Sequence, residues 1–295
     1  MIEQLNQEFA IGNSLKFLPH ASGLIQGIID TPVCSGSFFL LGGHVSAYQP
    51  KAQRHPVLFM SRDAIYAVGK PIRGGVPICF PWFGPKASEA TAPAHGLVRT
   101  ELWEVVESKK IGDSIAVRLQ RELPNYLLNF RIDFGASLKM QMCITNTSDQ
   151  TQQCELALHT YFQIGDLSKV FITGLESISF RDKLTSTIEP AAGRPIAFTA
   201  ETDRVYMGKV AEIALHDPAW NRIIRLVPEN SKSTVVWNPW IEKSKRLNDF
   251  ADDEYLQMCC IETANVHPDE LSINPGQTAV VGVQVQAQDQ STLPK

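Results

Sequence analysis

The sequence contains no long hydrophobic run. Nowhere do apolar residues approach the roughly 20 consecutive positions that a membrane-spanning helix needs. The first ten residues, MIEQLNQEFA, carry an acid at Glu3 and have no apolar centre, so they lack the features of a secretory signal peptide. We therefore expect a soluble, cytoplasmic protein that has no membrane partner.

An excess of positive charge is also missing. Lysine and arginine number 27 against 31 aspartates and glutamates, which gives a formal net charge of −4. Domains that bind nucleic acid usually present a basic face, so we expect no nucleic acid partner. An anionic ligand would have to be held by a few local cations rather than by the overall field of the protein.

Cysteine motifs are absent as well. The six cysteines have no CxxC spacing, and most lie inside apolar, strand-like runs; they are Cys34, Cys79, Cys143, Cys154, Cys259 and Cys260. This pattern favours buried free thiols over disulfides or a zinc site.

Helical periodicity is scarce, and the only candidates are residues 3–10 and 243–255. Alternation of apolar and polar residues dominates instead. It predicts one long half-buried strand over residues 130–148, in which one face carries Ile132, Phe134, Ala136, Leu138, Met140, Met142 and Ile144. Further strands are expected at 114–121, 211–217, 222–229, 233–239, 255–263 and 279–288. Without a βαβ rhythm, the chain is predicted to be all-β: one domain over residues 1–295, built as a large antiparallel β-sandwich or, nearly as well, a jelly roll.

One loop stands out, RGGVPICFPWFGP at residues 73–85. Each proline removes a backbone donor and fixes φ, so no helix can form there. The prolines predict a stiff loop that holds Arg73 in a preset position, and an arginine fork matches phosphate or carboxylate oxygens. The loop's aromatic residues could pack on a sugar ring, but we interpret them as anchors in the core, with at most Trp82 or Phe83 touching a substrate.

Two residues have the placement expected of an acid/base pair. In CELALHTYF, His159 shares a strand face with Ala157 and Tyr161, so it can point into a cleft. In YLQMCCIET, Glu262 shares an apolar face with Cys260 and has no charged neighbour. Burial raises the pKa of a carboxyl group, which suits a general base near neutral pH. The alternatives are an ordinary sheet histidine and a structural carboxylate bonded to backbone amides.

Three more polar residues are candidates for binding a substrate. His95 and Arg99 lie in APAHGLVRT, after a second proline, and Asp203 lies in ETDRVY. Arg73 and Arg99 could instead form surface ion pairs, and Asp203 could be a turn residue. Taken together, the acid/base pair, the two cations and the hydroxyl-binding candidates indicate a sugar that carries an anionic group.

Several segments resemble the glucose-6-phosphate 1-epimerases, the hexose-6-phosphate mutarotases of the aldose 1-epimerase superfamily. In chain order they are RGGVPICFPWFGP, PAHGLVRTELWEV, LALHTYFQIGDLSKV, ETDRVY, VVWNPWIEKSK and CCIETANV. The resemblance implies a β-sandwich of the galactose mutarotase type. It also implies that His159 and Glu262 are the catalytic residues, that Arg73, Arg99 and Asp203 contact the substrate, and that His95 lies at the site.

Two positions depart from the family pattern. Ala94 stands where some members have a glutamine that contacts substrate, and Leu97-Val98 replaces a frequent Phe-Ala pair before the arginine. The spacing from His95 to Arg99 is kept, so the arginine keeps its expected role.

The implied reaction interconverts the α and β anomers of a hexose 6-phosphate, with glucose 6-phosphate as the first choice. Glu262 would take the proton of the anomeric hydroxyl while protonated His159 gives one to the ring oxygen. This chemistry needs neither a metal nor a cofactor, and we expect a monomer. The alternatives are a mutarotase for unphosphorylated aldoses and a non-catalytic protein that binds sugar phosphates.

Overall fold

Two large antiparallel sheets dominate the structure, a computed structural model that describes residues 1–86 and 88–290. The nine-stranded sheet has the order β16 (Ile196–Ala197), β13 (Phe171–Thr173), β18 (Ile213–Asp217), β19 (Arg222–Glu229), β23 (Thr278–Asp289), β9 (Leu138–Asn146), β8 (Tyr126–Phe134), β7 (Ser114–Leu123) and β6 (Glu104–Ile111). The eight-stranded sheet has the order β15 (Thr187–Glu189), β14 (Phe180–Asp182), β17 (Thr202–Met207), β20 (Ser233–Asn238), β21 (Met258–Asn265), β11 (Leu156–Leu158) and β5 (Ile78–Cys79), and β12 (Tyr161–Gln163) also pairs with β21.

Two smaller sheets complete the fold. One contains β1 (Leu15–Pro19), β2 (Ile25–Asp30), β3 (Cys34–Phe39) and β4 (His44–Pro50), and the other pairs β10 (Gln152–Cys154) with β22 (Leu271–Ile273). Within residues 1–86 and 88–290, helix is limited to α1 (Ile2–Phe9), α2 (Trp240–Ser244) and three 3₁₀ turns at Val98–Thr100, Pro218–Trp220 and Glu254–Gln257. Among the described residues, no helix has both the length and the apolar character to cross a bilayer.

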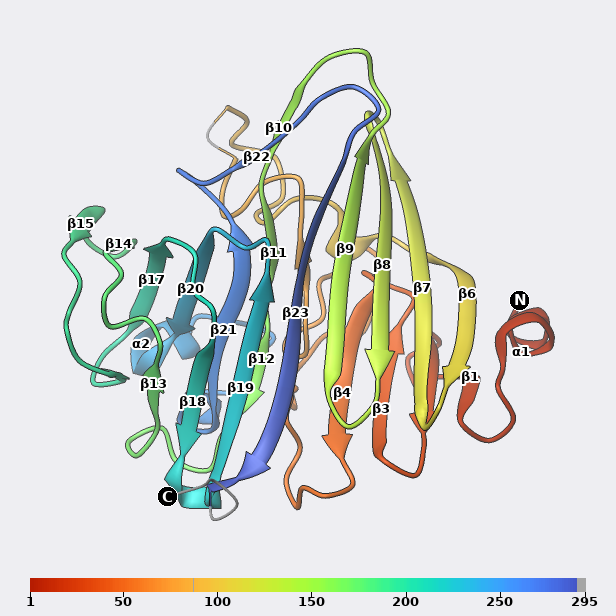
Figure 1. Ribbon diagram of the computed structural model, residues 1–295, viewed down its shortest axis with the longest axis horizontal. Helices are drawn as coiled ribbons and strands as arrows, with labels where there is room; N and C mark the ends of the chain where they lie inside the picture. The colour runs from red at the N-terminus through yellow and green to blue at the C-terminus, as the bar shows by residue number, and fades with distance from the viewer. Residues whose placement is uncertain (87, 291–295) are drawn as a thin grey trace.

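The sheets stack as two layers around one apolar core. The four-stranded sheet lies behind β8 and β9 of the nine-stranded sheet (Figure 1), where Phe38 stacks on Phe134 with ring centroids 6.3 Å apart. The Tyr48 hydroxyl also crosses this gap and donates a hydrogen bond of 3.0 Å to the Gly135 carbonyl. Buried residues of all three sheets form a continuous cluster between the layers. The predicted antiparallel β-sandwich is confirmed.

The strand predicted over residues 130–148 is wrong in one respect, because the segment is a hairpin. Residues 135–137 form a bend, and β8 turns back into β9. Residues that pair directly across an antiparallel ladder point to the same side of the sheet, and here Phe134 pairs with Leu138 and Ile132 with Met140. The hairpin therefore keeps the alternation of a single strand. Only Ala136, at the tip, leaves the predicted apolar face and is exposed.

The two helix predictions have different outcomes. The N-terminal helix is confirmed as α1, whereas no continuous helix forms over residues 243–255. There α2 ends at Ser244, and turns carry the chain on, which buries Phe250 against the eight-stranded sheet. The prediction of buried free thiols is confirmed. All six cysteines are free, and all but Cys143, which is partly exposed, are buried.

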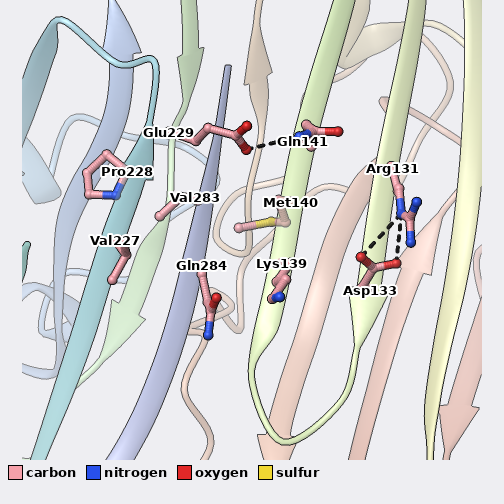
Figure 2. A pocket seen from close by; sticks show the side chains of 10 residues that line it. All are labelled: Arg131, Asp133, Lys139, Met140, Gln141, Val227, Pro228, Glu229, Val283 and Gln284. Carbon is pink, nitrogen blue, oxygen red and sulfur yellow. Dashed lines mark hydrogen bonds and ion pairs between the residues drawn. The ribbon is translucent and has the colours of Figure 1, made fainter. Parts of the chain in front are cut away.

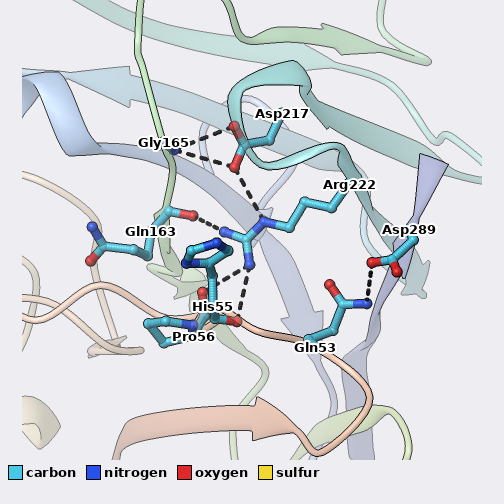
Figure 3. Close-up of polar contacts among 8 residues, drawn as sticks. All are labelled: Gln53, His55, Pro56, Gln163, Gly165, Asp217, Arg222 and Asp289. Carbon is cyan, nitrogen blue, oxygen red and sulfur yellow. Dashed lines mark hydrogen bonds and ion pairs between the residues drawn. The ribbon is translucent and has the colours of Figure 1, made fainter. Parts of the chain in front are cut away.

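A buried ion pair fastens the end of β12 to the nine-stranded sheet (Figure 3). Arg222 and Asp217 are 1% and 0% exposed at their side chains, and the Arg222 Nε lies 3.2 Å from an Asp217 carboxylate oxygen. Asp217 also accepts a hydrogen bond from the Gly165 amide. The Arg222 guanidinium donates to three main-chain carbonyls, those of His55, Pro56 and Gln163. The strand that follows His159 is thus fixed by a fully buried arginine.

Candidate active site

The outer face of the eight-stranded sheet carries the predicted acid/base pair. Along β21, Cys259 and Ile261 point into the core between the layers, whereas Met258 and Cys260 belong to a separate apolar cluster on the other face. Glu262 follows in the same alternation and points outward. The predicted face of Met258, Cys260 and Glu262 is confirmed, although residues 255–257 belong to a 3₁₀ turn and the strand begins only at Met258.

Two apolar clusters flank Glu262 on this outer face. The first contains Phe59, Tyr161, Trp237, Phe250, Met258 and Cys260. The second contains Cys79, Ala157, Val205, Val235, Ala264 and Val266. Because apolar surroundings solvate a charge poorly, polar groups placed between these clusters have shifted pKa values.

Glu262 and His159 lie together at the centre of this face. The His159 Nε2 is 3.3 Å from the Glu262 Oε1, and the Glu262 side chain is 1% exposed. Neither carboxylate oxygen has a hydrogen bond from any described residue. The alternative of a structural carboxylate bonded to backbone amides is therefore wrong. A buried carboxyl without hydrogen bonds is costly, which makes Glu262 a candidate functional group.

Burial shifts the two pKa values in opposite directions. It raises the pKa of Glu262 well above its ordinary value, and the nearby Asp203 charge raises it further. It lowers the pKa of His159 well below its ordinary value, and His95, Arg73 and Arg99 lower it further. Between these limits the pair holds one proton, which these directions place on the carboxyl, and the 3.3 Å separation of the two groups allows its transfer to the imidazole. One group can then accept a proton while the other donates one.

Tyr161 connects His159 to the predicted arginine of the stiff loop. Its ring stacks on the His159 imidazole with centroids 4.8 Å apart and planes 13° from parallel. Its hydroxyl accepts a hydrogen bond of 3.0 Å from the Arg73 NH1. The loop is fixed beside this strand, because the amides of His159 and Tyr161 donate to the carbonyls of Pro77 and Gly75. Arg73 is thereby placed one side chain away from the histidine.

Arg73 is already partly neutralised. Its Nε and NH2 lie 3.1 Å and 3.0 Å from the Asp249 Oδ1. A guanidinium has five N–H donors. Three are directed at Asp249 and Tyr161, which leaves two for a ligand. The alternative of a surface ion pair for Arg73 is wrong in its location, because the Arg73–Asp249 pair is mostly buried.

His95 lies over the pair at a tightly fitted turn. Its ring centroid is 5.9 Å from that of His159, and the following Gly96 has a φ of 77°. A side chain at Gly96 could not fit, because a Cβ there would lie 1.9 Å from the Phe80 carbonyl oxygen. Burial, helped by the charges of Arg99 and Lys183, lowers the pKa of His95 to about 3. The neutral ring accepts a hydrogen bond from the Gly84 amide at Nδ1, so its Nε2 carries a proton that it can donate.

Arg99 differs from Arg73 in its partners. Its NH2 donates a hydrogen bond of 2.6 Å to the Ala94 carbonyl, so the departure at Ala94 leaves a backbone contact in place. Within the described part of the chain, no carboxylate lies at ion-pair distance from Arg99. Arg99 lies four residues after His95, whose ring centroid is 5.9 Å from that of His159, and its charge lowers the pKa of both histidines.

Asp203 lies at the opposite end of the site, beside two lysines. The sheet register places Asp203, Trp237, Cys260 and Tyr161 in one row on the outer face. The Lys183 and Lys243 ammonium groups are 3.7 Å and 3.8 Å from the Asp203 carboxylate. Asp203 is therefore no ordinary turn residue.

All six predicted site residues thus gather on one face, but sequence reasoning missed several partners. Asp249 lies within the segment expected to be helical, and Lys243 lies within the quoted NPWIEKSK motif. Lys183 has no motif of its own in the sequence. Of the loop aromatics, Phe80 is fully buried in the core, which confirms its role as an anchor. Trp82 is only half-buried and donates to the Pro93 carbonyl.

The pair does not line the depression shown in Figure 2. That depression, of about 430 Å³, lies on the outer face of the nine-stranded sheet, over β8, β9, β23 and β19. It is lined by Arg131, Asp133, Lys139, Gln141, Glu229 and their neighbours, and none of the predicted site residues contributes to it.

Comparisons with known proteins define the class of fold. The crystal structure of "a putative mutarotase (YeaD) from Salmonella typhimurium" matches with a TM-score of 0.88 at 25% identity, over 95% of this chain and 96% of that one. A galactose mutarotase-like protein of Clostridium acetobutylicum matches with a TM-score of 0.67 at 15% identity, over 93% and 98% of the two chains. The fold is a galactose mutarotase-like β-sandwich.

Sequence comparisons define the family. A family model described as aldose 1-epimerase matches residues 29–286. A protein of Escherichia coli (strain K12) named "Putative glucose-6-phosphate 1-epimerase" is 33% identical over 243 residues, which covers 80% of this chain and 82% of the relative. A protein of Cenchrus ciliaris with the same name is 30% identical over 263 residues, 83% of this chain and 78% of the relative. The chain belongs to the aldose 1-epimerase family, and its activity is the interconversion of sugar anomers.

Proposed function

We propose that this protein interconverts the α and β anomers of a hexose 6-phosphate, with glucose 6-phosphate as its first substrate. Once the pair's proton has passed from Glu262 to His159, Glu262 accepts the proton of the anomeric hydroxyl, and protonated His159 donates a proton to the ring oxygen. The C1–O5 bond breaks, the open-chain aldehyde rotates about C1–C2, and closure on the other carbonyl face gives the opposite anomer. The proton transfers reverse on closure, so the pair ends with the single proton that it had at the start.

The distribution of charge around the pair supports one orientation of the sugar. In a hexopyranose the ring oxygen and C6 are both bonded to C5, so a group at C6 lies on the side of the ring oxygen. His159, the proposed donor to that oxygen, stacks on Tyr161, whose hydroxyl accepts a hydrogen bond from Arg73. Asp203 lies on the other side of Glu262, because β20 and β21 separate it from Tyr161 in the sheet. The position of Arg73 supports an orientation with the C6 phosphate on the His159 side.

The observation that carries the phosphate assignment is Arg99. A neutral sugar gains little from a guanidinium without a counter-ion, whereas a phosphate oxygen forms charge-assisted hydrogen bonds with it. The proton on the His95 Nε2 and the two remaining donors of Arg73 can add to these bonds. Asp203 accepts hydrogen bonds from hydroxyls at the far end.

The test is Arg99→Gln, assayed with glucose 6-phosphate and with free glucose. Loss of hydrogen bonds between charged groups, worth about 1.5–3 kcal/mol, should raise KM for the ester by roughly 10- to 100-fold. The rate with free glucose should be unchanged. Arg131→Gln, on the outer face of the other sheet, is the matched control and should behave as the wild type. An equal loss for both sugars would refute the phosphate role and favour an enzyme for unphosphorylated aldoses.

A further inference from the structure

Lys183 has no role in the proton transfers or in binding the phosphate, yet it points into the site. It follows β14, and its amide donates a hydrogen bond of 2.8 Å to the Asp203 carbonyl in the neighbouring strand. The Lys183 ammonium also lies close to Asp203, 3.7 Å from its Oδ1. The side chains of Lys183 and Asp203 are 30% and 14% exposed, so the pair is shielded but reachable.

The ammonium is also fixed from a second direction. It lies over the ring of Phe83, 4.7 Å from the centroid, and Phe83 belongs to the stiff loop that begins at Arg73. The Phe83 amide is held in turn by a hydrogen bond of 2.8 Å to the Glu155 carboxylate. A cation placed over an aromatic face and beside a carboxylate has little freedom, which favours specific recognition over general attraction.

Lys183 and Asp203 offer complementary hydrogen-bonding groups. An ammonium has only donors, and an ionised carboxylate has only acceptors. A sugar hydroxyl can accept from the first and donate to the second at the same time, and so can two hydroxyls on adjacent carbons. Lys243 lies 3.8 Å from Asp203 but is closer to Glu201, at 3.1 Å, so its charge is largely shared with that second acid.

The sugar's own connectivity decides which hydroxyl is recognised. Glu262 acts at the hydroxyl on C1, and C2 is the next carbon away from the ring oxygen. In the sheet, β21 with Glu262 lies between the β11–β12 segment that carries His159 and the strands β20 and β17, and β17 carries Asp203. Lys183, whose ammonium is 3.7 Å from the Asp203 carboxylate, therefore lies on the far side of Glu262 from His159, which is the C1–C2 side of the sugar.

We propose that Lys183 is a specificity residue that donates a hydrogen bond to the 2-hydroxyl of the substrate, while Asp203 accepts from that hydroxyl or from the neighbouring 3-hydroxyl. The inference rests on the proposed function. It extends that function from the phosphate end to the hydroxyl on C2, and it predicts that the enzyme distinguishes glucose 6-phosphate from its 2-deoxy analogue.

The experiment compares glucose 6-phosphate with 2-deoxyglucose 6-phosphate, using the wild type and Lys183→Met. The methionine keeps an apolar stem over Phe83 and removes the ammonium. In the wild type, kcat/KM should be about tenfold or more higher for the glucose ester, because a site built to bind a hydroxyl rejects an analogue that lacks it. In Lys183→Met, the value for the glucose ester should fall about tenfold and the preference should shrink to within roughly threefold.

The control is Lys169→Met, which removes an exposed lysine paired with Asp166 and should change neither value. Equal losses of kcat/KM for both esters in Lys183→Met would overturn the inference, because they would show a general electrostatic effect on Glu262. No loss for either ester would overturn it as well. Failure of the wild type to accelerate anomerisation of either ester would instead contradict the proposed function itself.

Discussion

Replacing Glu262 by glutamine should reduce the rate of anomerisation by about 10²–10⁴-fold, the usual contribution of one positioned acid or base. A glutamine has nearly the shape of the glutamate but cannot accept the proton of the anomeric hydroxyl. His159 would keep its stacking on Tyr161 but would lose the carboxyl that lies 3.3 Å away. The rate is measured with glucose 6-phosphate and a dehydrogenase specific for the β anomer.

The same variant should not unfold more easily than the wild type. Burial raises the pKa of Glu262, so the carboxyl favours folding when protonated and opposes it as the pH rises through that pKa. At neutral pH, Glu262→Gln removes the free-energy cost of burying an ionised carboxyl group. The urea concentration at the midpoint of unfolding should therefore be equal to that of the wild type or higher. Glu229→Gln, on the outer face of the other sheet, is the control that should leave the rate unchanged. Full activity of Glu262→Gln would contradict the assignment of the general base.

Replacing Arg222 by methionine should lower the free energy of unfolding by about 3–5 kcal/mol, the cost of leaving one partner of a buried ion pair alone. Asp217 would remain as a carboxylate with 0% exposure, and three main-chain carbonyls would lose their donor. The free energy is measured by urea denaturation.

Arg225→Met provides the matched control on the same strand. Arg225 pairs with Glu212 near the surface, and exposed pairs contribute only about 0–1 kcal/mol. The double variant Arg222→Met with Asp217→Asn should lose less than Arg222→Met alone, because no buried charge is left unpaired. A loss after Arg222→Met no larger than that after Arg225→Met would show that the ion pair does not fasten β12.

Much of the fold could be predicted where a strand has one buried face and one exposed face. The apolar and polar residues of β23 alternate in this way, and β19, β20 and β23 form within a residue or two of the predicted bounds. The hairpin at 135–137 could not be seen, because a tight turn between paired strands preserves the alternation. The false helix at 243–255 had a related cause. Its polar residues fit a helix surface, but Asp249 is used to bind Arg73.

For the site, the sequence predicts which residues share a face along one strand, but not which residues of different strands meet. The same-face rule places Glu262 beside Cys260 and His159 beside Tyr161, and the structure confirms both. Contacts between residues of different strands depend on the order and register of those strands, which cannot be read from the sequence. The pairing of Asp203 with Trp237 and of Trp237 with Cys260 brings the far end of the site together. The Asp249–Arg73 and Lys183–Asp203 contacts likewise join residues from separate strands and loops.

The central claim is that the buried His159–Glu262 pair opens and recloses the ring of a hexose 6-phosphate. The most direct test measures exchange between the two anomeric proton signals of glucose 6-phosphate by NMR, with and without the protein. The account predicts exchange well above the spontaneous rate and proportional to protein concentration. Binding of the ester with exchange no faster than in the protein-free sample would contradict it and would indicate a protein that binds sugar phosphates without catalysis.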